Sequence, residues 1–469
     1  MARFLAWLKR VSYGRRIAAG VTAYVAVAIP IVLHVPAELL NNWVPGLTPG
    51  EQGKLLGAAG NLVLLALGGV IAVVTVGLSL SRHRQELDAA ERDRQRLFDD
   101  QERERARLSE VADQRRVETE RSLRERFVTT VQLLSDTAPV NRQAALYALG
   151  ALADDWDALD KRDEVQVCIE VLTGYLRAPR TKEMLSPLDP EETQYTDPED
   201  YYVTQRTTPV EVSVKQAGYA VIRNHLQQGA SPSWHNHQLN LSRAHIDFPV
   251  ELPRPLITAD GALDLRGIWI GHNGSADLAA AQISGAGRLH LTEAVIVGNG
   301  SIDLRAAVVS ERGTVDLRDV SISHGQVHLM NAKVTGLGSV VLRGMRIRNR
   351  GIANLQDLSI GDGGNVDLTS ASIDKDGQVL LHKLAISNDG NVDLADAAIG
   401  GGGIIDLSRA VVSDRGRIDF ARTAIGATGR IDLSGAVISD GATVDLDAPK
   451  ITRGGRVIRP DGMSSMQAT

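Results

Sequence analysis

Cysteine is nearly absent from this chain of 469 residues, because Cys168 is the only one. A disulfide bond within the chain is therefore excluded, and a single thiol is typical of proteins in a reducing compartment. The sequence also lacks a phosphate-binding loop, a zinc-ligand spacing and a nucleophile elbow. We therefore expect no catalytic residue, no cofactor and no metal site, and we do not expect an enzyme.

Aromatic side chains are scarce, at 4% of the residues, and the formal net charge is only −6. This low aromatic content is consistent with a protein core that is narrow and filled by small and aliphatic side chains. From residue 261 to residue 457 the sequence has 22 acidic and 20 basic side chains, a net charge of −2. Because the charge of this segment is balanced, we do not expect nucleic acid as a partner.

A thirteen-residue repeat fills the sequence between residue 261 and about residue 453. Glycine opens fourteen successive repeats, and one of these repeats is a residue short. The third, fifth, eighth and tenth positions of each repeat are apolar, as in Ile302, Leu304, Ala307 and Val309. A fixed short period over this length is typical of a solenoid, in which each unit buries its apolar face against its neighbours.

Each repeat predicts two short strands, because the apolar positions form two pairs with a spacing of two. The opening glycine lies at the corner that joins one repeat to the next, where we expect it to supply a backbone with positive φ. One repeat could form a flattened two-sheet coil, or two repeats could form one four-faced coil of 26 residues. With strands about 4.8 Å apart, these coils would give rods of about 70 Å and about 35 Å respectively, and we favour the four-faced coil.

Aspartate occupies the fourth position in ten of the fifteen repeats, including Asp264 and Asp303. This position lies between two inward positions, so its side chain points outward. Calcium-binding β-rolls place paired glycines around their aspartates in a nine-residue repeat, and the present repeats lack that pattern. We therefore interpret the aspartates as corner caps that accept nearby backbone N–H groups.

Several five-residue units within the repeats resemble the pentapeptide-repeat family, whose pattern is a small residue, then Asp or Asn, then Leu and two variable residues. The clearest units are residues 240–244, 303–307, 406–410 and 432–436. The resemblance implies a right-handed, four-faced β-helix, and it assigns no chemistry. This chain departs from the family because three additional residues follow every two units.

Two long uncharged stretches near the N-terminus, residues 17–35 and 55–80, can each cross a hydrocarbon core of about 30 Å. Five basic residues precede the first stretch and Arg82 and Arg84 follow the second, whereas the connecting loop has a single lysine. The positive-inside rule then places both termini in the cytoplasm. We interpret residues 1–81 as the transmembrane hairpin of a multi-pass cell-membrane protein, in preference to a cleaved signal peptide.

Residues 82–126 contain no proline or glycine and are dominated by charged residues, which predicts a helical stalk. The heptad positions that begin at Leu87 and Ala90 are half polar, so we expect a single solvated helix or a weak coiled coil, with a basic strip on anionic lipid as a third interpretation. Three apolar stripes in residues 127–178 predict a small helical module. This module resembles the helical segment that precedes the repeats in bacterial membrane-anchored pentapeptide-repeat proteins.

Residues 179–208 are acidic and contain several prolines, which predicts a linker. Three tyrosines of this segment form a candidate docking patch, although we favour solvated side chains: Tyr195, Tyr201 and Tyr202. Residues 209–229 predict a helix, because Pro209 follows Thr208 at its start and Gly229 lies at its end.

The solenoid is predicted over residues 235–457, and the coil at residues 239–246 is expected to cap its open edge. Residues 458–469 are a polar tail. The main histidine cluster comprises His235, His237 and His245, and its spacing is a poor metal signal, so we interpret it as part of the loop and cap.

The modular order indicates a membrane-anchored cytoplasmic protein-interaction scaffold. Its expected partners are the lipid bilayer, a protein that the sequence does not identify and, through the apolar helices or the stalk, further copies of the chain. The resemblance to the pentapeptide-repeat family implies one alternative, a DNA mimic that binds a topoisomerase, but that function needs a strongly acidic rod and this one is nearly neutral. A self-assembling structural solenoid is a further alternative, and an enzyme that acts on glycans would need two facing carboxylates. The sequence names neither the partner nor the cellular process.

Overall fold

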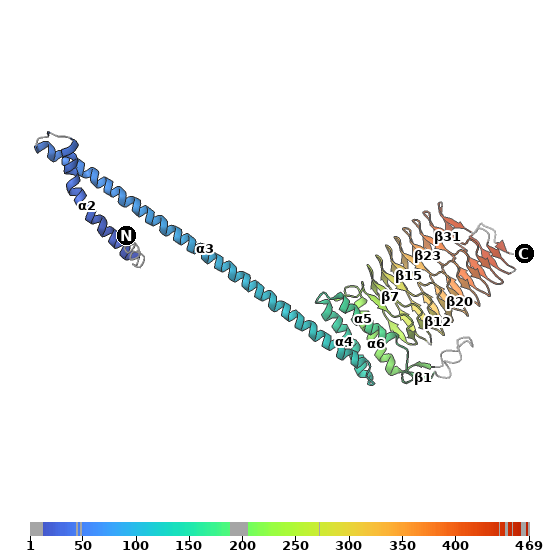
Figure 1. Cartoon of the computed structure of the whole chain (residues 1–469). Helices are drawn as coiled ribbons and strands as arrows, with labels where there is room; N and C mark the ends of the chain where they lie inside the picture. The colour runs from blue at the N-terminus through green and yellow to red at the C-terminus, as the bar shows by residue number, and fades with distance from the viewer. Residues whose placement is uncertain are drawn as a thin grey trace. The chain divides into compact units, whose positions relative to one another are not determined.

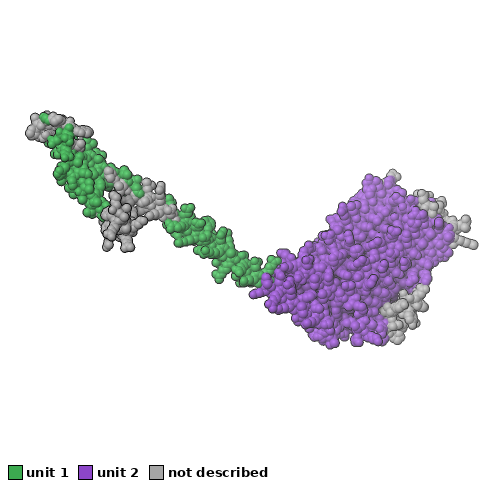
Figure 2. All heavy atoms as spheres, in the orientation of Figure 1, with its two compact units in different colours: residues 1–116 green, residues 117–469 purple. Residues whose placement is uncertain are grey.

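The computed structural model describes residues 13–43, 46, 49–187, 205–271, 273–439, 441–445, 449–452, 454–460 and 466–467. Two compact units make up the chain, residues 1–116 and residues 117–469 (Figure 2).

The first unit contains two apolar helical segments. Helix α2 (Tyr13–Trp43) includes a stretch at Ala19–Asn42 with mean hydropathy 1.8, and helix α3 (Pro49–Leu134) includes a stretch at Leu55–Gly77 with mean hydropathy 2.3. Both stretches are long and apolar enough to cross a membrane. Within this unit the Tyr24 hydroxyl donates a hydrogen bond of 2.8 Å to the carbonyl oxygen of Leu67.

The charged part of α3 is a continuous helix, and the leucines of its heptad seam are exposed. Leu87, Leu97 and Leu108, which belong to the half-polar heptad seam, are 55%, 63% and 60% exposed. Ion pairs one turn apart, such as Arg121–Glu125 at 3.0 Å, lie along its surface. Exposed pairs of this kind add only a few tenths of a kcal/mol each to helix stability, about 0.3–0.5.

The second unit begins with a helical bundle that continues from the end of α3. Helices α4 (Pro139–Asp157), α5 (Arg162–Arg177) and α6 (Pro209–Leu226) pack together. Thr208 caps α6 as expected, because its side chain accepts a hydrogen bond of 3.3 Å from the Glu211 N–H group.

Helix α6 packs into the same core as the helices of residues 127–178, whereas the sequence suggested a module of three helices with a separate helix after the linker. Two glycines allow this close packing. A Cβ atom at Gly150 would lie 2.7 Å from a Val221 methyl carbon, and a Cβ atom at Gly218 would lie 2.8 Å from a Leu176 methyl carbon. Such long-range contacts leave no periodic signal in the sequence.

The predicted linker is structured at both of its ends. A 3₁₀ turn, η1 (Lys182–Met184), leads into β1 (Leu185–Pro187), which pairs antiparallel with β2 (Gln205–Thr207). Residues 188–204, with Tyr195, Tyr201 and Tyr202, lie outside the described residues.

The solenoid consists of four parallel sheets, I to IV, each built from every fourth strand (Figure 1). Sheet I contains β3 (Gln238–Asn240), β7 (Ala262–Asp264), β11 (Arg288–His290), β15 (Thr314–Asp316), β19 (Ser339–Val341), β23 (Asn365–Asp367), β27 (Asn391–Asp393), β31 (Arg417–Asp419) and β35 (Thr443–Asp445). Sheet II contains β4 (His245–Ile246), β8 (Trp269–Ile270), β12 (Val295–Val297), β16 (Ser321–Ser323), β20 (Arg346–Arg348), β24 (Ser372–Ile373), β28 (Ala398–Ile399), β32 (Ala424–Ile425) and β36 (Lys450–Ile451).

Sheets III and IV complete each coil. Sheet III contains β5 (Pro249–Glu251), β9 (Ser275–Asp277), β13 (Ser301–Asp303), β17 (Gln326–His328), β21 (Ile352–Asn354), β25 (Gln378–Leu380), β29 (Ile404–Asp406), β33 (Arg430–Asp432), β37 (Arg456–Ile458) and, antiparallel to β37 within the tail, β38 (Met466–Gln467). Sheet IV contains β6 (Leu256–Ile257), β10 (Gln282–Ile283), β14 (Val308–Val309), β18 (Lys333–Val334), β22 (Ser359–Ile360), β26 (Ala385–Ile386), β30 (Val411–Val412) and β34 (Val437–Ile438).

One coil takes two repeats. Asn365 pairs with Asn391, 26 positions later, and Ser301 pairs with Gln326 across the one repeat that is a residue short. The favoured four-faced coil is therefore confirmed. The inward positions are also as predicted, because Ile302 and Ala307 are fully buried, as are most of their counterparts, whereas Ala436 and Val444 of the last coil are only partly buried.

The opening glycines do not have the positive φ that we expected. They are required because the coils approach closely at this corner: a Cβ atom at Gly364 would lie 2.4 Å from the Val334 carbonyl oxygen of the previous coil. Positive φ occurs instead at the seventh position of every one of the fourteen glycine-opened repeats, and most residues there are not glycine, as with Lys383 (φ 57°) and Arg409 (φ 59°).

Helices α5 and α6 lie against the first coil (Figure 1). The Gln166 side chain of α5 donates a hydrogen bond of 2.9 Å to the carbonyl oxygen of Gln238 in β3. The coil at residues 239–246 therefore starts the solenoid, as predicted, but it is itself covered by helices. Its other side pairs with β7 and β8.

Candidate functional site

The fourth-position aspartates are engaged at the corners of the solenoid. In nine of the ten, including Asp264 and Asp303, the side chain accepts the N–H group two residues later at 2.8–3.2 Å. Arg266 adds a second contact to Asp264 at 2.6 Å. Burial raises the pKa of Asp264, but the hydrogen bonds from the Arg266 side chain and backbone outweigh it and hold that pKa below its usual value. These contacts confirm the predicted corner caps.

The three histidines of the predicted cluster each contact a different partner. His237 Nδ1 lies 3.3 Å from Gln166 Oε1, His235 shares a hydrogen bond with Ser233, and His245 stacks on Trp269 with ring centroids 3.9 Å apart. Burial lowers the pKa of His237. Within the described residues, no three His, Cys, Asp or Glu side chains are arranged to hold a metal ion. Of the three, His237 contacts helix α5, through Gln166.

A buried polar network joins the helices of the bundle. Arg142 of α4 donates to Glu211 of α6 at 2.7 Å and to the Tyr175 hydroxyl of α5 at 2.9 Å, and Tyr175 donates to Glu211 at 3.0 Å. Glu211 is 2% exposed. Burial together with the Glu211 charge raises the pKa of Tyr175 to about 12, so the phenol remains protonated. A buried carboxylate of this kind needs its guanidinium partner.

Lys215 extends this network toward the solenoid. Its ammonium group donates to the carbonyl oxygen of Leu176 at 3.2 Å, and burial lowers its pKa. Nearby, Arg180 pairs at 2.7 Å with Asp247, whose side chain is fully buried and also accepts the Thr207 N–H group. The sequence gives no local sign of this network, because its partners lie 33 to 69 positions apart in the chain.

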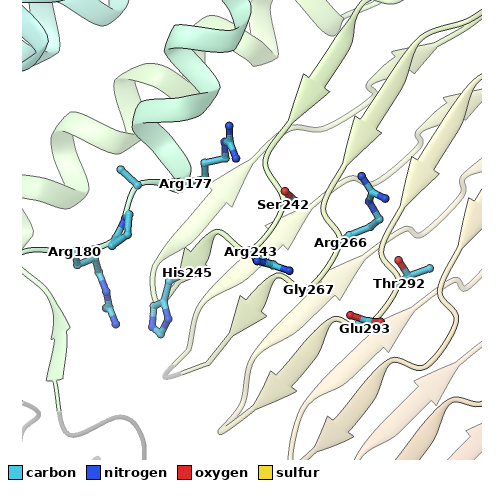
Figure 3. Close-up of a pocket in the computed structure, with 11 residues that line it drawn as sticks. Arg177, Arg180, Ser242, Arg243, His245, Arg266, Gly267, Thr292 and Glu293 are labelled. Atoms are coloured by element: carbon cyan, nitrogen blue, oxygen red, sulfur yellow. The ribbon is translucent and has the colours of Figure 1, made fainter.

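An arginine-lined cavity of about 770 Å³ opens between the end of α5 and the corner of sheets I and II (Figure 3). We call it the arginine cavity. Four arginines are among its lining residues: Arg177, Arg180, Arg243 and Arg266. His245, Ser242, Thr292 and Glu293 contribute the other polar side chains. The sequence gives no local sign of this site, since the arginines come from two distant segments.

Few acidic groups line the arginine cavity. Glu293 is the single carboxylate among its described lining residues, whereas glycan cleavage uses a facing pair of carboxyl groups. The Ser242 hydroxyl donates to Asn240 at 2.7 Å.

Comparison with known proteins gives this chain no relative, because no protein-family model, curated protein or solved structure matches it.

Proposed function

We propose that this chain is a membrane-anchored scaffold for protein interaction. In this proposal the apolar stretches of α2 and α3 span the cell membrane, both termini lie in the cytoplasm and the solenoid presents its faces to a protein partner. The chain would be a variant of the pentapeptide-repeat family with a right-handed coil. The four parallel sheets and the Asp-Leu units support that assignment.

The proposal is based on the difference between the inward side chains of the solenoid, which are constant, and the outward side chains, which vary. The tenth position, which points inward, is Ile or Val in every repeat. The outward ninth position on sheet II changes from coil to coil, as with Trp269, Val295, Ser321 and Arg346. A constant interior with a varied exterior is typical of repeat proteins whose regular surface recognises other proteins.

The two apolar stretches support the anchor. Leu62, Leu65 and Val73 are more than 70% exposed within their unit. A contiguous apolar surface of this kind is costly in water and is stabilised in lipid. The basic residues Arg82 and Arg84 after the second stretch support the orientation.

Photo-crosslinking in the native membrane tests the proposal. A crosslinking amino acid is placed at one exposed position on each sheet: Arg288 on I, Arg346 on II, Gln326 on III and Lys333 on IV. We expect the same protein adduct to form from one face or from two adjacent faces. Equal, non-specific adducts from all four faces, or a turnover measured with the purified chain, would remove the proposal.

A second candidate function, a DNA mimic, is disfavoured by the net charge of −2 over residues 261–457. A DNA supercoiling assay with a topoisomerase distinguishes it, since a scaffold leaves supercoiling unchanged.

A further inference from the structure

The arginine cavity has more positive charge than its surroundings neutralise. Arg180 pairs with Asp247 at 2.7 Å and Arg266 pairs with Asp264 at 2.6 Å. Among the residues that the structure describes, no carboxylate forms an ion pair with Arg177 or Arg243. Because Glu293 is the single carboxylate among the described lining residues, these two cations give the cavity an excess of positive charge that attracts anions.

Arg243 lies at a corner of the first coil where the next coil leaves room for its side chain. Its backbone has a φ of 58°, and the corresponding residue of the next coil is Gly267. A Cβ atom at Gly267 would lie 3.4 Å from Arg243 Cγ, so the glycine leaves room for the arginine stem to pass over the next coil. Figure 3 shows the Arg243 side chain extended along this corner toward Gly267.

Further donors surround the same space. Arg266 uses Nε and Nη2 to bind Asp264. Its Nη1 group has no hydrogen-bond partner among the described residues, and the Thr292 hydroxyl lines the cavity beside it. Several guanidinium N–H groups around one concavity match the three acceptor oxygens of a phosphate better than the two of a carboxylate.

We propose that the arginine cavity binds the phosphate group of a phosphate monoester, with Arg177 and Arg243 as the main charged contacts. A volume of about 770 Å³ leaves space for the organic part of such a ligand beyond the phosphate. This inference goes beyond the scaffold function and does not depend on it. The phosphate could belong to a soluble metabolite or to the headgroup of a monoester lipid.

The chain offers a matched control outside the cavity. Arg409 occupies the same seventh position with a φ of 59°, and Gly435 follows it in the next coil, where a Cβ atom would lie 3.5 Å from Arg409 Cγ. Arg409 lies on the corner of sheets III and IV, away from α5 and its arginines. Arg409→Gln therefore removes an equivalent side chain and leaves the arginine cavity intact.

The test uses the full chain in phosphatidylcholine nanodiscs and titrates glycerol 3-phosphate by calorimetry. We expect binding that weakens about tenfold in Arg177→Gln and in Arg243→Gln, because each removes a charge-assisted contact. Arg409→Gln is expected to bind as the wild type does. No binding by the wild type, wild-type affinity in both cavity variants, or an equal loss in Arg409→Gln would overturn the proposal.

A second arm identifies the source of the phosphate. The titration is repeated in nanodiscs in which part of the phosphatidylcholine is replaced by phosphatidic acid. If the lipid headgroup occupies the arginine cavity, glycerol 3-phosphate binding by the wild type is lost. Retained binding supports a soluble ligand. Circular dichroism of each variant checks that the fold is unchanged.

Discussion

The opening glycine of each repeat allows neighbouring coils to approach closely, because it has no Cβ atom. A Cβ atom at Gly403 would lie 2.5 Å from the Ile373 carbonyl oxygen of the previous coil, much closer than ordinary van der Waals contact. Three positions earlier, a Cβ atom at Gly400 would meet nothing closer than 3.7 Å. The two glycines lie at the same corner of the solenoid. Replacing each of them by alanine therefore distinguishes the steric effect of a Cβ atom from the loss of backbone flexibility.

Gly403→Ala is therefore expected to destabilise the solenoid by about 1–3 kcal/mol, the range for overpacked sites. Gly400→Ala is expected to change the free energy of unfolding by less than about 0.5 kcal/mol. Guanidinium unfolding of the full chain in detergent measures both. Equal effects of the two substitutions would contradict the close-approach explanation.

The seventh position of each repeat has the opposite requirement. Lys383 is exposed and has a φ of 57°, a conformation that costs a side chain with a Cβ atom about 1–2 kcal/mol. Lys383→Gly is expected to be more stable than Lys383→Ala by about 1 kcal/mol.

A neighbouring strand position provides the control for this comparison. Ala385 in β26 is exposed and extended, so Ala385→Gly should lose about 0.5–1 kcal/mol. The preference for glycine over alanine must reverse between the two positions. If thermal unfolding shows that the same residue, glycine or alanine, is the more stable one at both positions, residue 383 does not have a left-handed backbone conformation in solution.

The corner aspartates predict a dependence of stability on pH. Burial raises the pKa of Asp303, but hydrogen bonds from the Arg305 side chain and backbone outweigh it, so the folded pKa is below the unfolded value of about 3.9. A lowered folded pKa gives stability that is present above the unfolded pKa and is lost as pH falls through the folded pKa.

Asp303→Asn keeps an acceptor for the backbone N–H group and removes the charge. It is expected to cost less than about 1 kcal/mol at pH 7, because the Arg305 side chain is 56% exposed. The difference from the wild type should shrink below about pH 4. Thermal midpoints between pH 7 and pH 2 measure it, and a difference that grows toward acid pH would contradict the assignment.

At the scale of elements, the buried network in the bundle is expected to be more important than the many surface pairs. Arg142 and Glu211 are 11% and 2% exposed at their side chains and join α4 to α6. Glu211→Ala leaves a buried guanidinium without its carboxylate, and the expected cost is about 3–5 kcal/mol.

Glu251→Ala is the control for this prediction. Glu251 pairs with Arg223 at 3.3 Å, but its side chain is 68% exposed, so the expected cost is below about 1 kcal/mol. Intrinsic tryptophan fluorescence during guanidinium unfolding measures both variants. Comparable losses would mean that burial does not distinguish the two pairs.

The elements that could be predicted from sequence are those with a local signal. The spacing of apolar residues such as Ile302 and Leu304 was enough to predict two strands per repeat, and Thr208 was enough to place the start of α6. The reason for the glycines was predicted wrongly, because the atom that Gly403 approaches lies thirty positions earlier in the chain. The buried network and the arginine cavity also bring distant segments together, and such contacts leave no periodic pattern in the sequence.

At the scale of the whole molecule, the proposed function depends on two features that the sequence and the structure describe separately. The apolar stretches at Ala19–Asn42 and Leu55–Gly77 would provide the anchor, and the 26-residue coils would provide the surface. A scaffold needs both, because the solenoid without the stretches would lose its proposed place at the membrane.

Membrane fractionation of the full chain beside a chain without residues 1–81 tests this account most directly. We predict that the full chain stays in the membrane pellet after an alkaline carbonate wash and that the shortened chain is recovered in the supernatant. Release of the full chain by the wash would contradict the account, because the two apolar helices would then not span the bilayer.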